Sequence, residues 1–587
     1  MSTIPGVTVS VGEDADVLPP LAAQVECKVG TCSSGTANSV QAFTDSGALF
    51  AALGFGPLVD AASLGIASRV DGQPAPGPKV LVKALATVGT VGAVDATGAT
   101  VGNATLAVTG APNDAYDVRV LIGRSVIGLP ASKLGAAMAS VSVDGGATFG
   151  AETLVSAAGD LPAPGTGLTL TFTAGMPVTS ALGTGDVYRF STTAPQMSLS
   201  QAVAATQAFL DSPQDAEWVH VVGSPPPQLP VGGATVQSGT GPAITVTGTP
   251  TRHFLLVVKI DLAGARATAT FTYSLDGGTT WLGAGTLTAA TVALTGTGLT
   301  LNFATGNYVL AETYSAHSAW ALPAWAAAFD SLFADAEAAG RYLFAVLEAP
   351  PFPAMVNSTT RGVADAALAD AMSATSTRRV LVCAGEALLV FPNVLRQDVR
   401  SIGRGFTARL AAIRPSVHPG QFDQGPLQGV LGIDRDESKT PGLDAARFTT
   451  LRTFRGKTGV YVTRGRTTIA APSQYEGVQV LRVVNLAARV AWFEGFQFLN
   501  RAWRTNPDAT LDELAAQAIE SRIRTAMLAT LPSGGENPAL SDALFTIDRT
   551  EPIGTSHTLK GKGKVRPLGY SEFIEFDISA TANTATA

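Results

Sequence analysis

The sequence predicts an α/β (α+β) core with a mostly parallel or mixed sheet, interrupted by two all-β insertions and flanked by extended terminal strand arms. Three observations predict this class. Short, nearly continuous apolar runs alternate with helical patterns, which is typical of sheets covered on both faces. A sequence repeat interrupts that pattern. Both ends of the chain alternate with the period of half-buried strands.

The core is predicted from five apolar strands, four of which follow a helical stretch. In chain order the strands lie at 23–32, 79–86, 217–223, 341–350 and 378–385, and the helices at 45–56, 199–210, 325–336 and 363–372. Helices between successive strands favour parallel pairing. The core therefore occupies residues 21–87, 196–235 and 324–550, where the last range also holds a helical C-terminal region.

The two insertions are predicted at 88–195 and 236–323. "SVDGGATF" at Ser142–Phe149 returns as "SLDGGTTW" at Ser274–Trp281, and "GTGLTLTFTAG" from Gly165 returns as "GTGLTLNFATG" from Gly296. Alternating Thr, Val and Leu punctuated by glycine predict a small β-sandwich in each copy. Each Asp-Gly-Gly is expected to form a turn, because Asp-Gly supplies the positive φ of tight hairpins. One Asp per turn is too few ligands for calcium.

A helix with a capping box is predicted near the end of the last core range. Thr510 with Glu513 has the spacing of a capping box. One apolar face would follow the helical period. It comprises Leu511, Leu514, Ala518, Ile523, Met527 and Leu531.

Two terminal arms are predicted at 1–20 and 551–587. Alternation places three residues of each arm on one face, and a detached strand of this kind pairs with an open sheet edge. These residues are Val7, Val9 and Val11 in the first arm and Ile574, Phe576 and Ile578 in the second. Gly561, Gly563 and Pro567 are expected to form a flexible neck that acts as a hinge for the second arm.

Composition excludes several classes of protein. Only 14% of the 587 residues are charged, against about 25% in an average soluble protein. Three cysteines, Cys27, Cys32 and Cys383, cannot form a closed disulfide framework, and no histidine cluster completes a zinc site beside them. The start of the chain lacks the pattern of a signal peptide, and no apolar run approaches 18 residues. Export and membrane insertion are therefore not expected.

No catalytic equipment is recognisable, so the chain is predicted not to be an enzyme and to need no cofactor or metal. Around Lys457 a phosphate loop fails because Leu451 stands where glycine is required. The segment from Asp434 begins like a calcium loop but has Lys439 at its sixth position. The five histidines are dispersed. Dense basic blocks with interleaved aromatics are absent from the sequence, so direct nucleic-acid binding is not expected.

Four segments in a fixed order resemble the tail sheath proteins of contractile bacteriophages and contractile injection systems. They are "IPGVTVSV" near the start, "FTDSGALFAALGFGPLVDAA" at Phe43–Ala62, "TGVYVTRGRTT" at Thr458–Thr468 and the closing "VRPLGYSEFIEFDI". The resemblance covers the core, the last third and both arms, whereas the two insertions depart from it as variable outer modules.

The resemblance implies a structural and mechanical role. Copies would form hexameric rings, stacked as a helical sleeve around a tail tube protein and locked by strands donated between neighbours. Baseplate and tail terminator proteins would be the further partners. The sheath would be assembled in the bacterial host cytoplasm, would form part of the virion, and would contract to drive the tube through the target envelope.

Charge is unevenly distributed along the chain. Between Arg396 and Arg566 there are 24 Lys and Arg against 16 Asp and Glu. The basic third is either ordinary solvated surface or a contact surface of complementary charge. If the protein is a sheath, such a surface would face the tube or neighbouring copies. If so, neutralising four arginines together should impair tube-bound assembly. These are Arg482, Arg489, Arg501 and Arg504.

The alternative is a virion or cell-surface adhesin with tandem glycan-binding β modules. Phe149 and Trp281 follow the two Asp-Gly-Gly turns and could stack on sugars. The alternation along each strand instead points both side chains inward, so that we expect them in the sandwich cores.

Overall fold

The computed structural model describes residues 24–572 apart from 97–101, 126–132, 176–181, 230, 251–252, 296, 319–320, 352–357 and 393–395. The chain forms two compact units. The first comprises residues up to 481 without 416–418, and the second comprises 416–418 and the residues from 482 onward.

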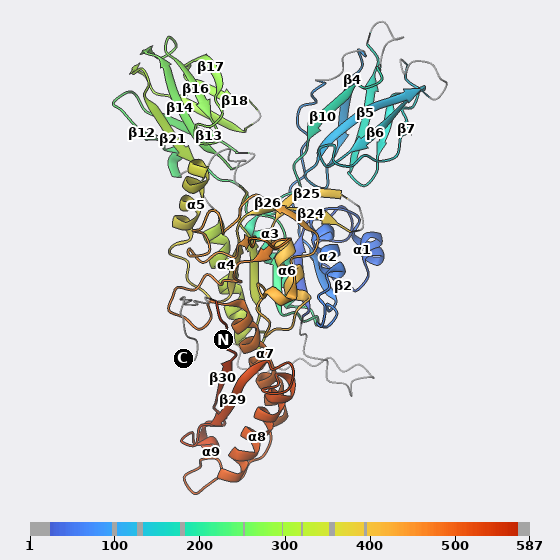
Figure 1. The fold of residues 1–587 in the computed structure, drawn as a ribbon. Coiled ribbons are helices and arrows are strands. Elements are labelled where there is room, and N and C mark those ends of the chain that lie inside the picture. The colour runs from blue at the N-terminus through green and yellow to red at the C-terminus, as the bar shows by residue number, and fades with distance from the viewer. Residues whose placement is uncertain are drawn as a thin grey trace, which may run out of the picture. The chain divides into compact units, whose positions relative to one another are not determined.

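A six-stranded sheet forms the centre of the first unit, in the order β2-β3-β1-β11-β22-β23 (Figure 1). The strands are β1 (Glu26–Gly30), β2 (Val40–Phe43), β3 (Lys79–Lys83), β11 (Trp218–Val221), β22 (Phe344–Glu348) and β23 (Val380–Cys383). All pair in parallel except β2, which is antiparallel at one edge. The predicted mixed α/β core is confirmed, since each of the five predicted apolar runs contains one of the parallel strands.

Helices cover both faces of this sheet. On one face α3 (Leu199–Leu210), α4 (Leu322–Ala338) and α5 (Ser358–Met372) share an apolar core with strand residues such as Val29 and Val221. The Ser198 and Gln201 capping box begins α3. On the other face α1 (Ser46–Leu53) packs on α2 (Pro57–Ala67), and α2 and α6 (Gly403–Ala411) pack with a three-stranded sheet. Its strands are β24 (Glu386–Phe391), β25 (Arg396–Ser401) and β26 (Val430–Ile433).

The connections change sides of the sheet between β1 and β11. From β1 the chain passes through α1 and α2 to β3, whereas from β3 it passes through α3 on the opposite face to β11. Both β modules are inserted at the edge where the parallel strands end, called here the carboxyl edge. Open α/β sheets place ligand crevices at such a change of side.

The first β module contains two sheets around one apolar cluster. Its four-stranded sheet has the order β10-β5-β6-β7 and its three-stranded sheet the order β4-β9-β8. The strands are β4 (Thr105–Gly110), β5 (Asp117–Ser125), β6 (Ala137–Ser142), β7 (Thr153–Leu154), β8 (Asp160–Ala163), β9 (Leu168–Thr173) and β10 (Val187–Ser191).

The second β module likewise contains a five-stranded and a three-stranded sheet around one apolar cluster. The orders are β12-β21-β14-β16-β17 and β13-β19-β18. The strands are β12 (Val236–Gln237), β13 (Ile244–Gly248), β14 (Leu255–Leu262), β16 (Thr270–Ser274), β17 (Leu282–Leu287), β18 (Thr291–Leu294), β19 (Leu299–Phe303) and β21 (Thr313–His317).

The second unit packs a helix on a two-stranded hairpin. Helix α8 (Glu513–Thr530) lies against β29 (Leu540–Ile547), which pairs antiparallel with β30 (Gly561–Pro567). The helix α7 (Val478–Gly495) precedes α8.

The predicted start of α8 is wrong. Its predicted apolar face is confirmed at Leu511, Ile523, Met527 and Leu531, which are buried, and is wrong at Leu514 and Ala518, which are exposed. The helix begins at Glu513 with Asp512 as N-cap, while Thr510 Oγ1 donates to Asp508 Oδ1 at 2.6 Å instead of capping. With this start, the helical period buries Ala516, Ile519, Ile523 and Met527. Leu514 falls on the outer face and is 74% exposed.

Candidate functional site

A row of ionisable side chains crosses the face of the central sheet that α2 and α6 cover. Lys28 Nζ on β1 lies 2.9 Å from Glu26 Oε2, and Lys79 Nζ on β3 lies 3.4 Å from Glu26 Oε1. On the next strands His220 Nε2 lies 3.0 Å from Glu348 Oε1. All five residues are buried. We call them the buried ionic row.

Lys28 joins the two parts of the buried ionic row. Its Nζ lies 3.1 Å from His220 Nδ1 and donates to Thr407 Oγ1 on α6 at 2.9 Å. Burial and the neighbouring Lys28 charge lower the pKa of His220, so its imidazole is neutral. With Nδ1 accepting from Lys28, the ring proton lies on Nε2 and is donated to Glu348. Burial would raise the pKa of Glu348, but the His220 hydrogen bond and the Arg404 charge hold it below its usual value.

A glycine lets α6 come close enough to complete this arrangement. A Cβ on Gly403 would lie 3.2 Å from Glu348 Cγ and 3.4 Å from His220 Nε2. A larger residue would therefore push the first turn of α6 away from the sheet. Arg404, in that turn, places its Nε 3.8 Å from Glu348 Oε1.

Hydrogen bonds link a hydroxyl, an imidazole and a carboxylate in the order used by hydrolases. Thr407 Oγ1 lies 3.2 Å from His220 Nδ1, and His220 Nε2 lies 3.0 Å from Glu348 Oε1. Thr407 and His220 are fully buried. The single Thr407 hydroxyl proton is donated to the helix carbonyl of Gly403 at 2.9 Å, and His220 Nδ1 accepts from Lys28. Because no substrate can reach this hydroxyl, the arrangement is structural.

A second charged cluster joins the first β module to the core. Arg396 on β25 places Nη2 2.6 Å from Asp60 Oδ2 on α2 and 3.0 Å from Asp114 Oδ2 in the module. Arg400 Nη2 pairs with Asp114 Oδ1 at 3.2 Å and with Asp398 Oδ2 at 2.6 Å. Burial raises the pKa of Asp60, whereas the two arginines overcome burial and lower that of Asp114.

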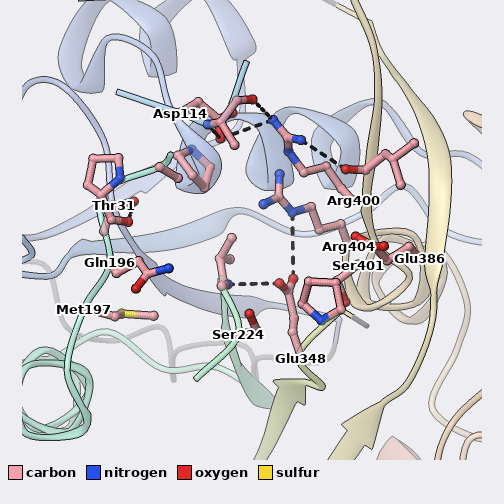
Figure 2. Close-up of a pocket in the computed structure, with 18 of the residues that line it drawn as sticks. Thr31, Asp114, Gln196, Met197, Ser224, Glu348, Glu386, Arg400, Ser401 and Arg404 are labelled. Carbon is pink, nitrogen blue, oxygen red and sulfur yellow. Dashed lines mark hydrogen bonds and ion pairs between the residues drawn. The ribbon is translucent and has the colours of Figure 1, made fainter. Parts of the chain in front are cut away.

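A cavity of about 210 Å³ lies at the carboxyl edge of the sheet (Figure 2). Thr31 follows β1, Ser224 follows β11 and Glu348 ends β22, so three neighbouring parallel strands meet at its wall. Arg404 from α6 and Asp114 from the first β module also line it. The cavity thus lies at the change of side between β1 and β11, where α/β folds bind ligands.

Glu386 at the start of β24 also lines the cavity and gives stability an unusual pH dependence. Burial raises the pKa of Glu386 to about 7, and the negative charges of Asp434, Asp398 and Glu348 add to this effect. The positive charge of Arg400 opposes it. The folded protein therefore binds this proton at a pH where the unfolded chain has released it, so its contribution to stability increases as pH falls from 8 to 5. We expect Glu386→Gln to be more stable than the parent at pH 8, by up to about 3 kcal/mol, and nearly equal at pH 5.

Urea unfolding at the two pH values measures this difference. Glu536→Gln, at an exposed glutamate, is the control and should leave both values unchanged. Equal stabilisation by Glu386→Gln at pH 5 and pH 8 would contradict the assignment.

The hairpin of the second unit leaves one strand exposed. Arg524 Nε of α8 donates to the Ala543 carbonyl of β29 at 2.8 Å, and Ile547 N of β29 donates to Glu520 Oε1 of α8 at 2.7 Å. Helix α8 thus provides hydrogen-bond partners for two backbone groups of β29. In β30 the residues 561–564 are exposed. The chain then leaves the hairpin and Tyr570 Oη donates to the Ser416 carbonyl at 2.7 Å.

Comparison with protein-family models and with curated proteins finds no match. Solved structures do match. A sheath tail protein from Desulfitobacterium hafniense shares 11% identity over 96% of this chain and 100% of its own length, with a TM-score of 0.36. One from Listeria innocua shares 10% identity over 94% of this chain and 93% of its own, with a TM-score of 0.39.

A third match is the sheath complex of an extracellular contractile injection system, PVC, in its contracted state. Its chain shares 16% identity, with 43% of this chain and 68% of that chain covered and a TM-score of 0.30. This chain is similar to sheath proteins.

The predicted assembly residues fall mostly outside the described part of the chain. Val7, Val9, Val11, Ile574, Phe576 and Ile578 all lie outside the described residues. Their role in assembly stays a prediction.

The predicted neck forms a regular β-strand. Gly561, Gly563 and Pro567 lie in β30, where Gly561 pairs with Ile547, Gly563 with Phe545 and Pro567 with Leu540. Glycine fits beside the Phe545 ring, because a Cβ on Gly561 would lie 2.6 Å from its Cζ. The expected flexible segment is therefore corrected to a strand, while the proposed hinge function is untested.

Two of the four arginines chosen for charge complementarity are buried. Arg482 and Arg489 on α7 are both buried, so neither can present its charge to a tube. Arg501 and Arg504, in the segment before α8, are exposed. Charge counted along the sequence did not distinguish these two situations.

The repeated Asp-Gly-Gly segments form the same hydrogen-bonded loop. In the first β module Ser142 Oγ donates to Asp144 Oδ1 at 2.7 Å, Gly146 N donates to Ser142 Oγ at 2.8 Å and Thr148 N donates to Asp144 Oδ1 at 2.9 Å. The second β module repeats these bonds with Ser274, Asp276, Gly278 and Thr280, at 2.7, 2.7 and 2.8 Å. The Asp oxygens are thus used by the loop itself.

The aromatic residues after these loops are not in the sandwich cores. Phe149 is 43% exposed and Trp281 is 42% exposed. The prediction from alternation is wrong because the loop residues end the strand pairing before the aromatic position is reached: β6 ends at Ser142 and β16 ends at Ser274. Phe149 instead lines a surface groove with Phe55 and Tyr116.

Among the described residues, no group of three or more His, Cys, Asp or Glu side chains could hold a metal ion. No helix among them has both the length and the apolar character required to cross a membrane.

Proposed function

We propose that this chain is a structural and mechanical subunit of a contractile sheath that self-assembles around a tube. The observation that carries the proposal is the β29–β30 hairpin, whose strand β30 is exposed. A two-stranded ribbon is marginal by itself, and an exposed strand is a template for pairing with another chain. The segment after Tyr570 has the alternation of a strand that could provide the missing partner.

In this proposal the C-terminal arm of one copy adds to the hairpin of a neighbour. About five strand hydrogen bonds would contribute roughly 1 kcal/mol each. Burial of Ile574, Phe576 and Ile578 would add about 1.5–3 kcal/mol for each side chain. Because Tyr570 is bonded to Ser416 within its own unit, we place the hinge after Tyr570 and not at the glycines of β30. The N-terminal arm would pair in the same manner.

Linked copies would form stacked rings, hexameric by resemblance to the sheath family. The exposed Arg501 and Arg504 could contact the tube protein, and the baseplate and terminator proteins would close the two ends. The work of contraction would come from relaxation of a metastable assembly. The sheath would be a component of a phage tail or injection particle assembled in the bacterial cytoplasm. The structural neighbours do not favour the adhesin alternative.

Electron microscopy of the purified full chain tests this proposal. We expect tubes or stacked rings from the parent and dispersed particles after Phe576→Lys, because the lysine would place a charge on the apolar face of the arm. Asp577→Lys is the matched control, since it places the same charge on the opposite face and should still assemble.

Removal of residues 573–587 provides a second variant. It should abolish polymer growth while leaving thermal unfolding of the remaining chain unchanged. Normal tubes from either the truncated chain or Phe576→Lys would overturn the strand-exchange proposal.

A further inference from the structure

We propose that the cavity at the carboxyl edge of the central sheet binds a small oxyanion, an inorganic phosphate or a short carboxylate, through Arg404. This inference goes beyond the sheath function and does not depend on it. The cavity belongs entirely to the first unit, so one copy of the chain contains the whole site.

Arg404 supplies the main argument. The residue is 4% exposed, its Nε lies 3.8 Å from Glu348, and neither Nε nor the buried Nη1 has a hydrogen-bond partner among the described residues. Figure 2 shows the guanidinium reaching into the cavity, between Arg400 and Ser224. A buried cationic donor without an acceptor is costly. An acceptor inside the cavity would remove that cost.

Two of the three carboxyl groups that line the cavity, those of Asp114 and Glu348, are already engaged with protein donors. The third belongs to Glu386, whose pKa is raised to about 7 by burial and nearby carboxylates, so below that pH it holds a proton and can itself donate. Asp114 is bound by Arg396 and Arg400, and it also accepts from Ala115 N at 2.8 Å. Glu348 accepts from His220, as described above, and from Gly223 N at 3.0 Å. The chemistry left to bind a ligand is therefore that of a donor, which an oxyanion satisfies and a cation does not.

Neutral polar groups complete the wall opposite Arg404. Thr31, Gln196 and Ser224 line the cavity (Figure 2). The Thr31 hydroxyl donates to the Pro195 carbonyl at 3.5 Å, so the Gln196 amide and the Ser224 hydroxyl are the suitable donors to the remaining oxygens of an anion. The α6 helix begins at this wall with Gly403 and Arg404. The partial positive charge of a helix N-terminus also favours an anion.

The volume limits the ligand. About 210 Å³ exceeds the space of one water, about 30 Å³ in the liquid, and accommodates a phosphate or a short carboxylate. Such an anion would touch the ends of β1 and β11 and the first turn of α6. Ser224 lies in the segment that leads from β11 to the second β module, and Gln196 in the segment that leads from the first β module to α3. The bound anion would therefore fix the bases of both insertions.

The test uses the full-length protein and two probes, sodium phosphate and sodium acetate, each compared with sodium chloride at equal ionic strength. We expect a saturable rise in melting temperature and heat of binding by titration calorimetry with at least one probe. Arg404→Gln should weaken the apparent affinity at least tenfold. Arg124→Gln, at an arginine whose side chain is 84% exposed, is the matched control and should bind as the parent does.

A second variant separates loss of the site from loss of the fold. Ser224→Leu keeps every charge but fills the cavity, and it should also weaken binding at least tenfold. Binding of phosphate alone or of acetate alone supports the site and identifies which oxyanion it accepts. The inference is overturned if neither probe gives a saturable shift, or if folded Arg404→Gln or Ser224→Leu binds as tightly as the parent.

Discussion

Lys28→Met should lower the free energy of unfolding by about 3–5 kcal/mol. Lys28 is fully buried and its ammonium group contacts Glu26, His220 and Thr407. Methionine fills similar space but leaves Lys79 as the only ion-pair partner that the buried Glu26 carboxylate has among the described residues. Breaking a buried ion pair by removing one member is costly because the remaining charge cannot return to water.

Urea unfolding of the full chain measures this loss. Lys439→Met is the matched control, because the side chain of Lys439 is 75% exposed and its ion pair should contribute less than about 1 kcal/mol. The double variant Lys28→Met with Glu26→Gln should recover part of the loss, since it removes the stranded carboxylate. A loss below about 1 kcal/mol for Lys28→Met would show that the buried ionic row does not stabilise the core.

Arg396→Met should cost a similar amount, about 3–5 kcal/mol at pH 8. It removes the only ion-pair partner that Asp60 has among the described residues, whereas Asp114 keeps Arg400. Burial already raises the pKa of Asp60 to about 6 with Arg396 present. Without the arginine this carboxyl should take up a proton at still higher pH, so the loss should be smaller at pH 5 than at pH 8.

The pH comparison distinguishes an electrostatic loss from simple loss of packing. Asp60→Asn in the Arg396→Met background should restore stability at pH 8 and change little at pH 5. Arg124→Met, on the exposed surface of the first β module, should change neither value. An Arg396→Met loss that is the same at both pH values would contradict the role given to Asp60.

The five parallel strands of the central sheet were predictable because they are apolar runs between helices, whereas the antiparallel edge strand β2 was not predicted. The buried ionic row within those strands was missed. The sequence contains one signal for it. Glu26 and Lys28 are two residues apart on β1 and therefore lie on the same face of the sheet, and Lys79 stands at the start of another apolar run. Which charges meet depends on the order β3-β1-β11-β22, and local pattern does not determine strand order.

The second unit was predicted less well. Glycine and proline residues indicate an irregular segment only if no partner strand is near. Here β29 pairs with Gly561, Gly563 and Pro567. Pro567 is the last residue of β30, where a strand tolerates the missing N–H. The cavity could not be predicted, since Thr31, Ser224 and Arg404 are brought together only by the complete fold.

The matching loops of the two β modules bear on how the sequences of these modules evolve. Every bond cited for each loop is supplied by seven consecutive residues, from Ser142 to Thr148 and from Ser274 to Thr280. From the rest of its module each loop takes the same backbone hydrogen bond, in which Gly145 N donates to the Asp117 carbonyl of β5 and Gly277 N donates to the Leu255 carbonyl of β14. The aromatic residue that follows the loop differs between the two modules, phenylalanine in the first and tryptophan in the second. Evolution can therefore substitute this residue while the loop before it keeps its geometry.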